Sequence, residues 1–112
     1  MSSTPAFTVE VGQPDGDRVS IHVKGELDLA ATPTLTQAIV GSAGPPRIHL
    51  DLSGVTFLDS SAIGALVASG REVGEAGSRL EIGPRSDTVS RVLEITGLAE
   101  SSEAFDVLPD GG

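Results

Sequence analysis

The chain has 112 residues, of which 38% are hydrophobic, so it is long enough for one folded domain with a single core but not for two. Its 16 Asp and Glu residues against 7 Lys and Arg residues give a formal net charge of −9, which disfavours binding to nucleic acid or to an anionic membrane surface. The absence of cysteine excludes disulfides and thiolate chemistry, and we expect a cytoplasmic protein because no segment has the composition of a secretory signal or a membrane span.

Alternating apolar and polar residues predict two strands near the start of the chain. Residues 7–11 and 18–24 both alternate in this way, as expected of strands that bury one face. The segment between them contains Pro14 and Gly16, which favour a tight turn. We therefore expect the two strands to form an antiparallel hairpin.

A helix and a third strand are expected next. Residues 30–40 have apolar side chains at helical spacing, with Thr32 as a suitable N-cap and Pro33 at the first helical position. The Gly and Pro residues that follow are expected to end this helix. Residues 47–52 then alternate like a strand with one buried face, and a Ser-Gly bend at residues 53–54 is expected to end it.

The next segment predicts a second helix followed by a fourth strand. From Ile63 to Val73, apolar residues recur every three or four positions, so this segment is expected to be a helix that Gly77 ends. Residues 79–82 are expected to be a short strand, because a Gly-Pro pair follows them and stops regular pairing.

The chain is expected to finish with a third helix and a short strand. Ser86 is a suitable N-cap for the helix, and Gly97 is a suitable stop. Beyond them, Phe105 and Val107 alternate in the manner of a strand.

This order of elements predicts an α/β fold. Strands that alternate with helices favour parallel pairing through right-handed crossovers. We expect a small mixed sheet, made of the N-terminal hairpin plus parallel strands, flanked by helices. The expected boundaries are a disordered N-terminus over residues 1–5, one domain over residues 6–108 and a flexible C-terminus over residues 109–112.

The sequence does not indicate a metal, cofactor or hydrolytic site. His22 and His49 lie on the polar faces of their predicted strands, and neither has a second ligand at metal-binding spacing, so we expect surface histidines and no metal. The chain lacks the glycine-rich phosphate-binding motifs and the G-x-S-x-G motif of serine hydrolases, and no motif places a histidine as a base. We therefore expect no cofactor and no enzymatic activity.

Asp59, Ser60 and Ser61 stand where the second helix is expected to begin. Asp and Ser are common N-caps, because their oxygens accept hydrogen bonds from the free N–H groups of the first turn. Spacing alone favours this structural role. A phosphorylation site is the functional alternative, because a helix N-terminus is exposed and favours a phosphate. The phosphate would add about −1.5 to −2 charges at pH 7 beside Asp59 and, if the two strand ends are neighbours, beside Asp28.

Three segments together resemble a known family. Residues 25–28 (Gly-Glu-Leu-Asp), residues 50–61 (Leu-Asp-Leu through Phe-Leu-Asp-Ser-Ser) and residues 95–98 (Ile-Thr-Gly-Leu) are similar to motifs of the STAS domain of bacterial anti-sigma factor antagonists. The motifs occur in the order and at the spacing of the family. The resemblance covers nearly the whole chain, from about residue 7 to residue 98.

The resemblance implies a regulatory binding function together with the α/β fold. Members of the family bind an anti-sigma factor that is also a serine kinase, and they thereby free the sigma factor. The kinase phosphorylates the serine directly after the Asp of the motif, which is Ser60 in this chain, and phosphorylation ends binding. A serine phosphatase removes the phosphate and restores binding to the anti-sigma factor. Ser61 is a second possible acceptor.

The resemblance also implies a partner-binding surface. The Asp of the Gly-Glu-Leu-Asp motif, here Asp28, and the Asp before the serine, here Asp59, belong to this surface in the family. The family usually has Gly where this chain has Ala62, a residue that suits the first turn of a helix. The implied partner-binding residues are Glu26, Asp28, Asp59, Ser60, Ser61 and Ala62.

Two other functions stay open. The first is a STAS interaction scaffold or accessory subunit whose serines act only as caps. In that case Ser60→Asp leaves partner binding intact. The second is a serine hydrolase, in which case Ser60 reacts with a fluorophosphonate probe.

Overall fold

The sheet contains five strands, and its topology matches the sequence prediction. The computed structural model describes residues 6–109, so the predicted disorder of residues 1–5 and flexibility of residues 110–112 lie outside the described residues. The strands are β1 (Phe7–Val11), β2 (Arg18–Leu27), β3 (Arg47–Leu58), β4 (Arg79–Arg85) and β5 (Asp106–Val107). β1 pairs with β2 in the antiparallel sense, and the others pair in parallel in chain order. The α/β mixed sheet is confirmed.

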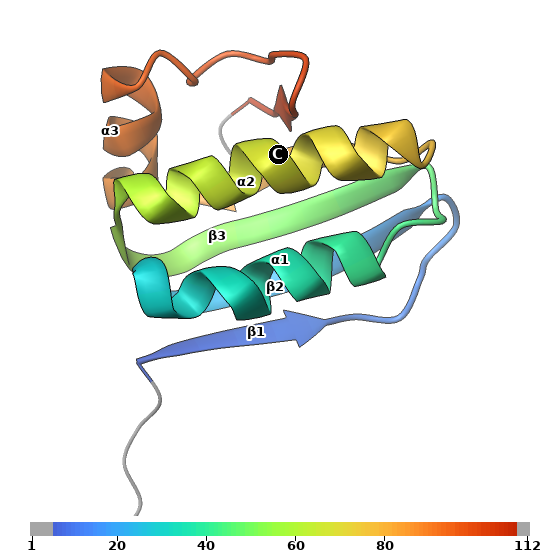
Figure 1. The fold of residues 1–112 in the computed structure, drawn as a ribbon, viewed down its shortest axis with the longest axis horizontal. Coiled ribbons are helices and arrows are strands. Elements are labelled where there is room, and N and C mark those ends of the chain that lie inside the picture. The colour runs from blue at the N-terminus through green and yellow to red at the C-terminus, as the bar shows by residue number, and fades with distance from the viewer. Residues whose placement is uncertain (1–5, 110–112) are drawn as a thin grey trace, which may run out of the picture.

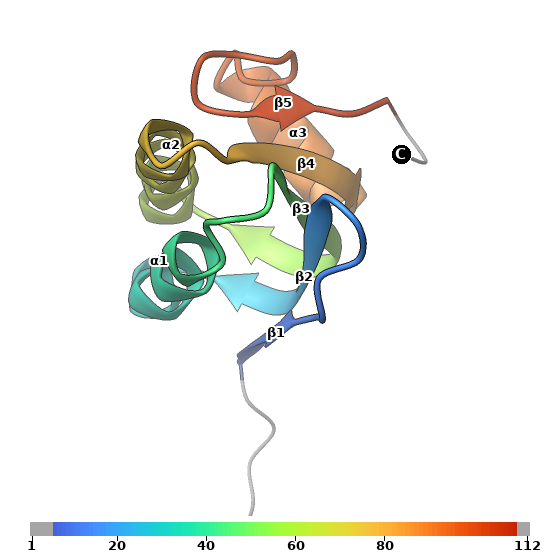
Figure 2. The same cartoon turned by 90° about the vertical axis from the view of Figure 1, so that its right-hand side faces the viewer.

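The helices are η1 (a 3-10 turn, Leu29–Ala31), α1 (Thr32–Gly41), α2 (Ser60–Glu75) and α3 (Asp87–Ile95). α1 and α2 lie side by side over one face of the sheet (Figures 1 and 2). α3 packs against β3 at the end of the sheet where that strand finishes (Figure 1). The start of α2 therefore lies at the same end of the molecule as α3.

The apolar core lies between the sheet and the layer formed by α1 and α2. Ile48 and Leu50 of β3 are fully buried, and so are Leu66 and Val73 of α2. Burial of a side chain of this size contributes about 1.5–3 kcal/mol to folding. Phe105, just before β5, is also fully buried, so the short C-terminal strand is anchored in the core.

β3 continues past the bend predicted at residues 53–54 and ends at Leu58. Between Asp51 and Gly54, β3 contains one residue more than the part of β2 with which it pairs, which is a β-bulge. The predicted end of the strand is wrong, because the bulge absorbs the Ser-Gly pair without ending the pairing. The strand thus leads directly into the start of α2.

β4 also continues through its predicted stop, and it ends at Arg85 instead of Ile82. Between the residues that pair with Leu50 and Leu52 of β3, β4 contains one extra residue. Pro84 lies in this irregular stretch, where a residue without an N–H group is tolerated. The Gly-Pro pair therefore marks a bulge and not the end of the strand.

Thr32 is not the N-cap of α1, as the sequence had suggested. The turn η1 precedes the helix, and the side chain of Asp28 caps it by accepting a hydrogen bond from the N–H of Ala31, with an N···O distance of 3.3 Å. The Thr32 hydroxyl donates to the carbonyl of Leu29 at 2.9 Å, and Thr32 is the first residue of α1. The capping oxygen lies one turn earlier, in the Gly-Glu-Leu-Asp motif.

The predicted ends of α2 and α3 are confirmed. Gly77 and Gly97 follow these helices with φ angles of 92° and 77°, the left-handed conformation that closes a helix. Ser86 caps α3 by accepting a hydrogen bond from the N–H of Val89 at 3.3 Å.

Candidate functional site

The carboxyl ends of β2 and β3 lie next to each other, and a helical turn begins at each. Leu27 and Leu58 are partners in the sheet, and the N–H of Asp59 donates to the carbonyl of Leu27 at 3.2 Å. Asp28 and Asp59 directly follow the two strands, and each caps the turn that comes after it. The expected proximity of these two aspartates is confirmed.

Ser60 is the first residue of α2, and its side chain is exposed. The cap of this helix is Asp59, whose carboxylate accepts a hydrogen bond from the N–H of Ala62 at 3.0 Å. Within residues 6–109, the Ser60 hydroxyl has no hydrogen-bond partner. The capping role is thus performed by the aspartate, and the serine is exposed beside it.

The next two residues of α2 differ from Ser60 in exposure. Ser61 is partly buried, so its hydroxyl is less accessible than that of Ser60. Ala62 is fully buried, so its side chain packs in the core. The assignment of Ala62 to the partner-binding surface stays a prediction. The methyl group that replaces the family's glycine hydrogen also points away from the surface that Ser60 occupies.

The site is acidic and lies at a helix N-terminus. Glu26 is exposed near the end of β2, next to the partly buried Asp28, and Asp59 lies on the adjacent strand end. The N-terminus of α2 carries partial positive charge, which favours an anionic group on Ser60. The helix N-terminus and the three carboxylates therefore have opposite electrostatic effects on an anion at this site.

Two exposed apolar residues of this region are not among the residues predicted from the sequence. Leu29, in η1, and Phe57, which pairs with Glu26, are both exposed. Leu29 precedes the buried stripe of α1, whereas Phe57 follows Val55 at strand spacing, so the apolar pattern does not mark Phe57 as exposed. Periodicity alone gives no exposed fraction.

The polar face of the sheet holds a buried carboxylate. Glu81 is 1% exposed, and its carboxylate lies 3.1 Å from Nδ1 of His49, 3.0 Å from Nε of Arg18 and 3.5 Å from the guanidinium of Arg47. His49 is itself buried, because Glu81 is its direct partner on β4. The prediction of a surface histidine is therefore wrong for His49 and confirmed for His22.

Neither His22 nor His49 is hydrogen-bonded to Ser60 or Ser61 within the described residues. His22 bonds to Asp51, and His49 bonds to Glu81. Burial acts to raise the pKa of Asp51, but hydrogen bonds from Ser53 and His22 outweigh it and hold this pKa below its ordinary value. The described part of the chain contains no group of three residues able to hold a metal ion.

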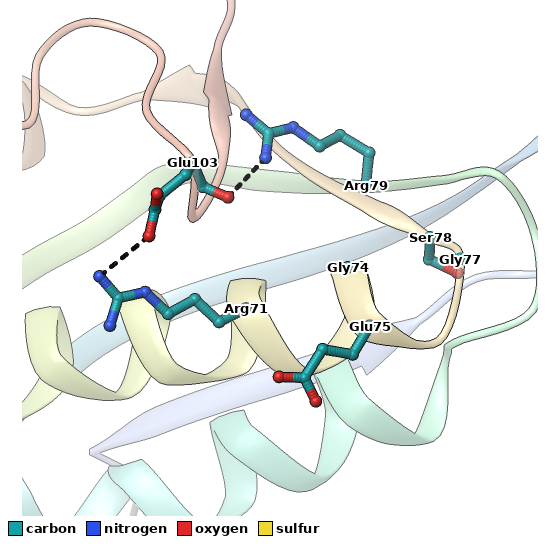
Figure 3. Close-up of a pocket in the computed structure, with 7 residues that line it drawn as sticks. All are labelled: Arg71, Gly74, Glu75, Gly77, Ser78, Arg79 and Glu103. Carbon is teal, nitrogen blue, oxygen red and sulfur yellow. Dashed lines mark hydrogen bonds and ion pairs between the residues drawn. The ribbon is translucent and has the colours of Figure 1, made fainter.

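An open pocket of about 570 Å³ lies at the opposite end of α2 (Figure 3). Arg71 and Arg79 extend toward it, and both bond to Glu103, Arg71 through the carboxylate at 3.6 Å and Arg79 through the carbonyl at 2.8 Å. Arg79 also binds the carboxylate of Asp106 at 2.8 Å and the carbonyl of Ser102. These arginines hold the C-terminal segment in place, and the pocket contains none of the site residues.

No helix within residues 6–109 is long and apolar enough to cross a bilayer.

A family model described as "Mlab, STAS domain" matches residues 12–109.

Two named relatives and one solved structure share this similarity over most of their length. Anti-sigma-F factor antagonist RsfB of Mycobacterium tuberculosis is 30% identical over 112 residues, which is 98% of this chain and 90% of that protein. The anti-sigma-B factor antagonist of Listeria monocytogenes is 29% identical over 103 residues, or 90% of each chain. The crystal structure of an anti-sigma factor antagonist from Mycobacterium paratuberculosis matches with a TM-score of 0.76 at 30% identity, covering 97% of this chain and 91% of that one.

Proposed function

The chain belongs to the STAS domain family, and we propose that it is an anti-sigma factor antagonist switched by phosphorylation of Ser60. In its unphosphorylated form it binds an anti-sigma factor, which then releases its sigma factor. The observation that carries the proposal is the exposed Ser60 hydroxyl, which has no hydrogen-bond partner within residues 6–109 and begins a helix that Asp59 already caps. The names of the similar proteins support the antagonist function.

The charge of the site accounts for a switch. Glu26, Asp28 and Asp59 lie at the adjoining ends of β2 and β3, where α2 begins with Ser60, and they contribute roughly −3 charges at neutral pH. A phosphate adds about −1.5 to −2 charges, so the same surface then carries roughly −5. The dipole of α2 favours the phosphate within this protein. A partner that fits the unmodified surface instead meets added charge and bulk at the centre of the contact.

The proposed partners are an anti-sigma factor with serine kinase activity and a serine phosphatase. The kinase transfers the γ-phosphoryl group of its ATP to Oγ of Ser60, the hydroxyl proton is released and ADP leaves. The phosphatase hydrolyses the phosphoserine to serine and inorganic phosphate. This chain supplies the acceptor and the binding surface, and it requires no cofactor of its own. Location in the cytoplasm stays a prediction.

Phosphate mapping tests the proposal. The purified protein is incubated with its cognate anti-sigma factor kinase and ATP, and the site is identified by mass spectrometry. We expect a single phosphate on Ser60, which Ser60→Ala abolishes and Ser61→Ala retains. An unmodified protein would contradict the proposal and favour a scaffold whose serines are not regulated. A phosphate on Ser61 alone would also contradict the assignment to Ser60, and it would identify Ser61 as the acceptor.

A further inference from the structure

β1 forms one edge of the sheet, and within residues 6–109 no strand lies on its outer side (Figure 2). On its inner side, the N–H of Gly12 donates to β2 and the carbonyl of Ala6 accepts from it, both at 2.8 Å. Because backbone groups alternate in direction along an antiparallel strand, Phe7, Val9 and Val11 turn their N–H and C=O groups away from β2. In the described part of the chain these outward groups have no hydrogen-bond partner.

The two edges of the sheet differ in their protection against a further strand. At the other edge, β5 has only two residues and Pro109 follows it closely, and both features discourage pairing. β1 has five residues, contains neither Pro nor Lys, and pairs with β2 without a bulge. Glu10 is its one charged residue. The β1 edge is therefore able to accept one more strand.

The sequence of β1 is complementary to a second copy of itself. When two β1 strands pair in the antiparallel sense about a twofold axis at Val9, Thr8 of each copy faces Glu10 of the other. A hydroxyl group then lies opposite a carboxylate, and no like charges meet. The same register places Phe7 of each copy opposite Val11 of the other.

An apolar groove lies where this register brings the phenyl ring. Val11 is 51% exposed, and it lines an open groove of about 280 Å³ together with Val19, Ala43 and Pro45. Phe7 and Val11 project from the same face of β1, because they are four residues apart on a strand. The ring of the second copy therefore lies beside Val11, and pairing removes apolar surface of both residues from water.

We propose that β1 is a self-association edge, through which two copies of the chain pair antiparallel about Val9 and join their sheets into one. This inference goes beyond the proposed function and does not depend on it. One short strand from each copy supplies the contact, so we expect a weak dimer with a Kd on the order of 10–100 μM.

Sedimentation equilibrium at total protein concentrations from about 10 to 500 μM tests the inference. We expect the wild type to change from monomer to dimer over this range. Val9→Pro removes an N–H group that points outward and that β2 does not use. This variant is expected to keep its fold, as measured by circular dichroism, and to stay monomeric.

Thr8→Glu tests the register. The new carboxylate faces Glu10 of the second copy, which opposes dimerisation, whereas within one copy it faces Lys24 and favours the pairing of β1 with β2. We expect the dimer to be weaker by at least about threefold while the fold is retained. Thr88→Glu, at an exposed threonine of α3, is the matched control for the added charge, and we expect it to dimerise like the wild type.

A wild type that is monomeric at every concentration would overturn the inference. A folded Val9→Pro protein that dimerises like the wild type would also overturn it. Equal weakening by Thr8→Glu and Thr88→Glu would show a general effect of charge and would contradict the register. If Val9→Pro does not fold, the comparison of the two glutamate variants still decides the outcome.

Discussion

The sequence predicts both a helix cap and a phosphorylation site at Asp59, Ser60 and Ser61. In the structure, Asp59 is the cap, and Ser60 is the candidate for phosphorylation. Asp59 supplies the capping oxygen for α2, at 3.0 Å from the N–H of Ala62. Ser60 has an exposed hydroxyl without a hydrogen-bond partner among the described residues. The serine is therefore free to change its chemistry without loss of the helix cap.

This division predicts different stabilities for two single substitutions. Asp59→Ala removes the cap and is expected to lower the free energy of unfolding by about 1 kcal/mol. Ser60→Ala removes a hydroxyl that stabilises nothing within the described residues, so a change within about 0.5 kcal/mol is expected. Urea unfolding of the three proteins measures both values. Equal losses in the two variants would show that the serine shares the capping role.

Residue exposure is the part that the sequence predicts least well. Strand alternation correctly places His49 on the polar face of β3, but it does not show whether that face is covered. Glu81 lies opposite His49 and the imidazole approaches Gly83 closely, so the ring is buried. The family resemblance likewise places Ala62 on the partner-binding surface, and the resemblance does not show that the side chain is buried in the core.

The elements were predicted in the right order because their apolar patterns are clear. All five strands and the three α-helices occur where the periodicity places them, including the short β5. The errors lie at the predicted ends of β3 and β4, because Gly and Pro are common both in turns that end a strand and in β-bulges that do not end it. Residues 53–54 and Pro84 both lie at β-bulges. Whether such residues form a turn or a bulge depends on the neighbouring strand, which is part of the tertiary structure and cannot be read from the local sequence.

The C-terminal segment crosses α2 at Gly70. A Cβ atom at this position would overlap the carbonyl oxygen of Ala104, so Gly70→Ala must displace the segment that precedes β5. We expect a loss of about 1–3 kcal/mol in the free energy of unfolding.

Gly64→Ala is the matched control, because it lies in the same helix with open space around the new methyl group. Its higher helix propensity is expected to stabilise the protein by up to about 1 kcal/mol. Thermal or urea unfolding compares the two variants. A Gly70→Ala protein as stable as the Gly64→Ala protein would mean that the C-terminal segment is not packed on α2.

Asp106 is a carboxylate that the fold pairs with an arginine, Arg79. A hydrogen bond from the Arg79 guanidinium holds the pKa of Asp106 below its ordinary value, against the opposing effect of burial, and the charges of Arg79 and Arg47 add to it. A carboxyl group whose pKa is lowered by folding stabilises the folded state above its unfolded pKa. This stabilisation is lost as the pH falls through the folded value.

Asp106→Asn is therefore expected to be less stable than the wild type at pH 7, and the difference is expected to shrink as the pH falls below about 4. Glu100→Gln, at an exposed carboxylate, controls for the loss of one negative charge from a chain of net charge −9. Urea unfolding across the acidic range measures the effect. A stability difference between Asp106→Asn and the wild type that does not change with pH would exclude the Arg79 pair as its cause.

Fold and binding site thus meet at one end of the domain, where parallel strands finish and α2 begins (Figure 1). The central claim is that a phosphate on Ser60 decides whether this end binds its anti-sigma factor. The most direct test is isothermal titration of the anti-sigma factor with the unphosphorylated protein and with protein fully phosphorylated at Ser60. We predict an affinity at least about 30-fold lower for the phosphorylated form, which corresponds to about 2 kcal/mol. Equal affinities for the two forms would contradict the account.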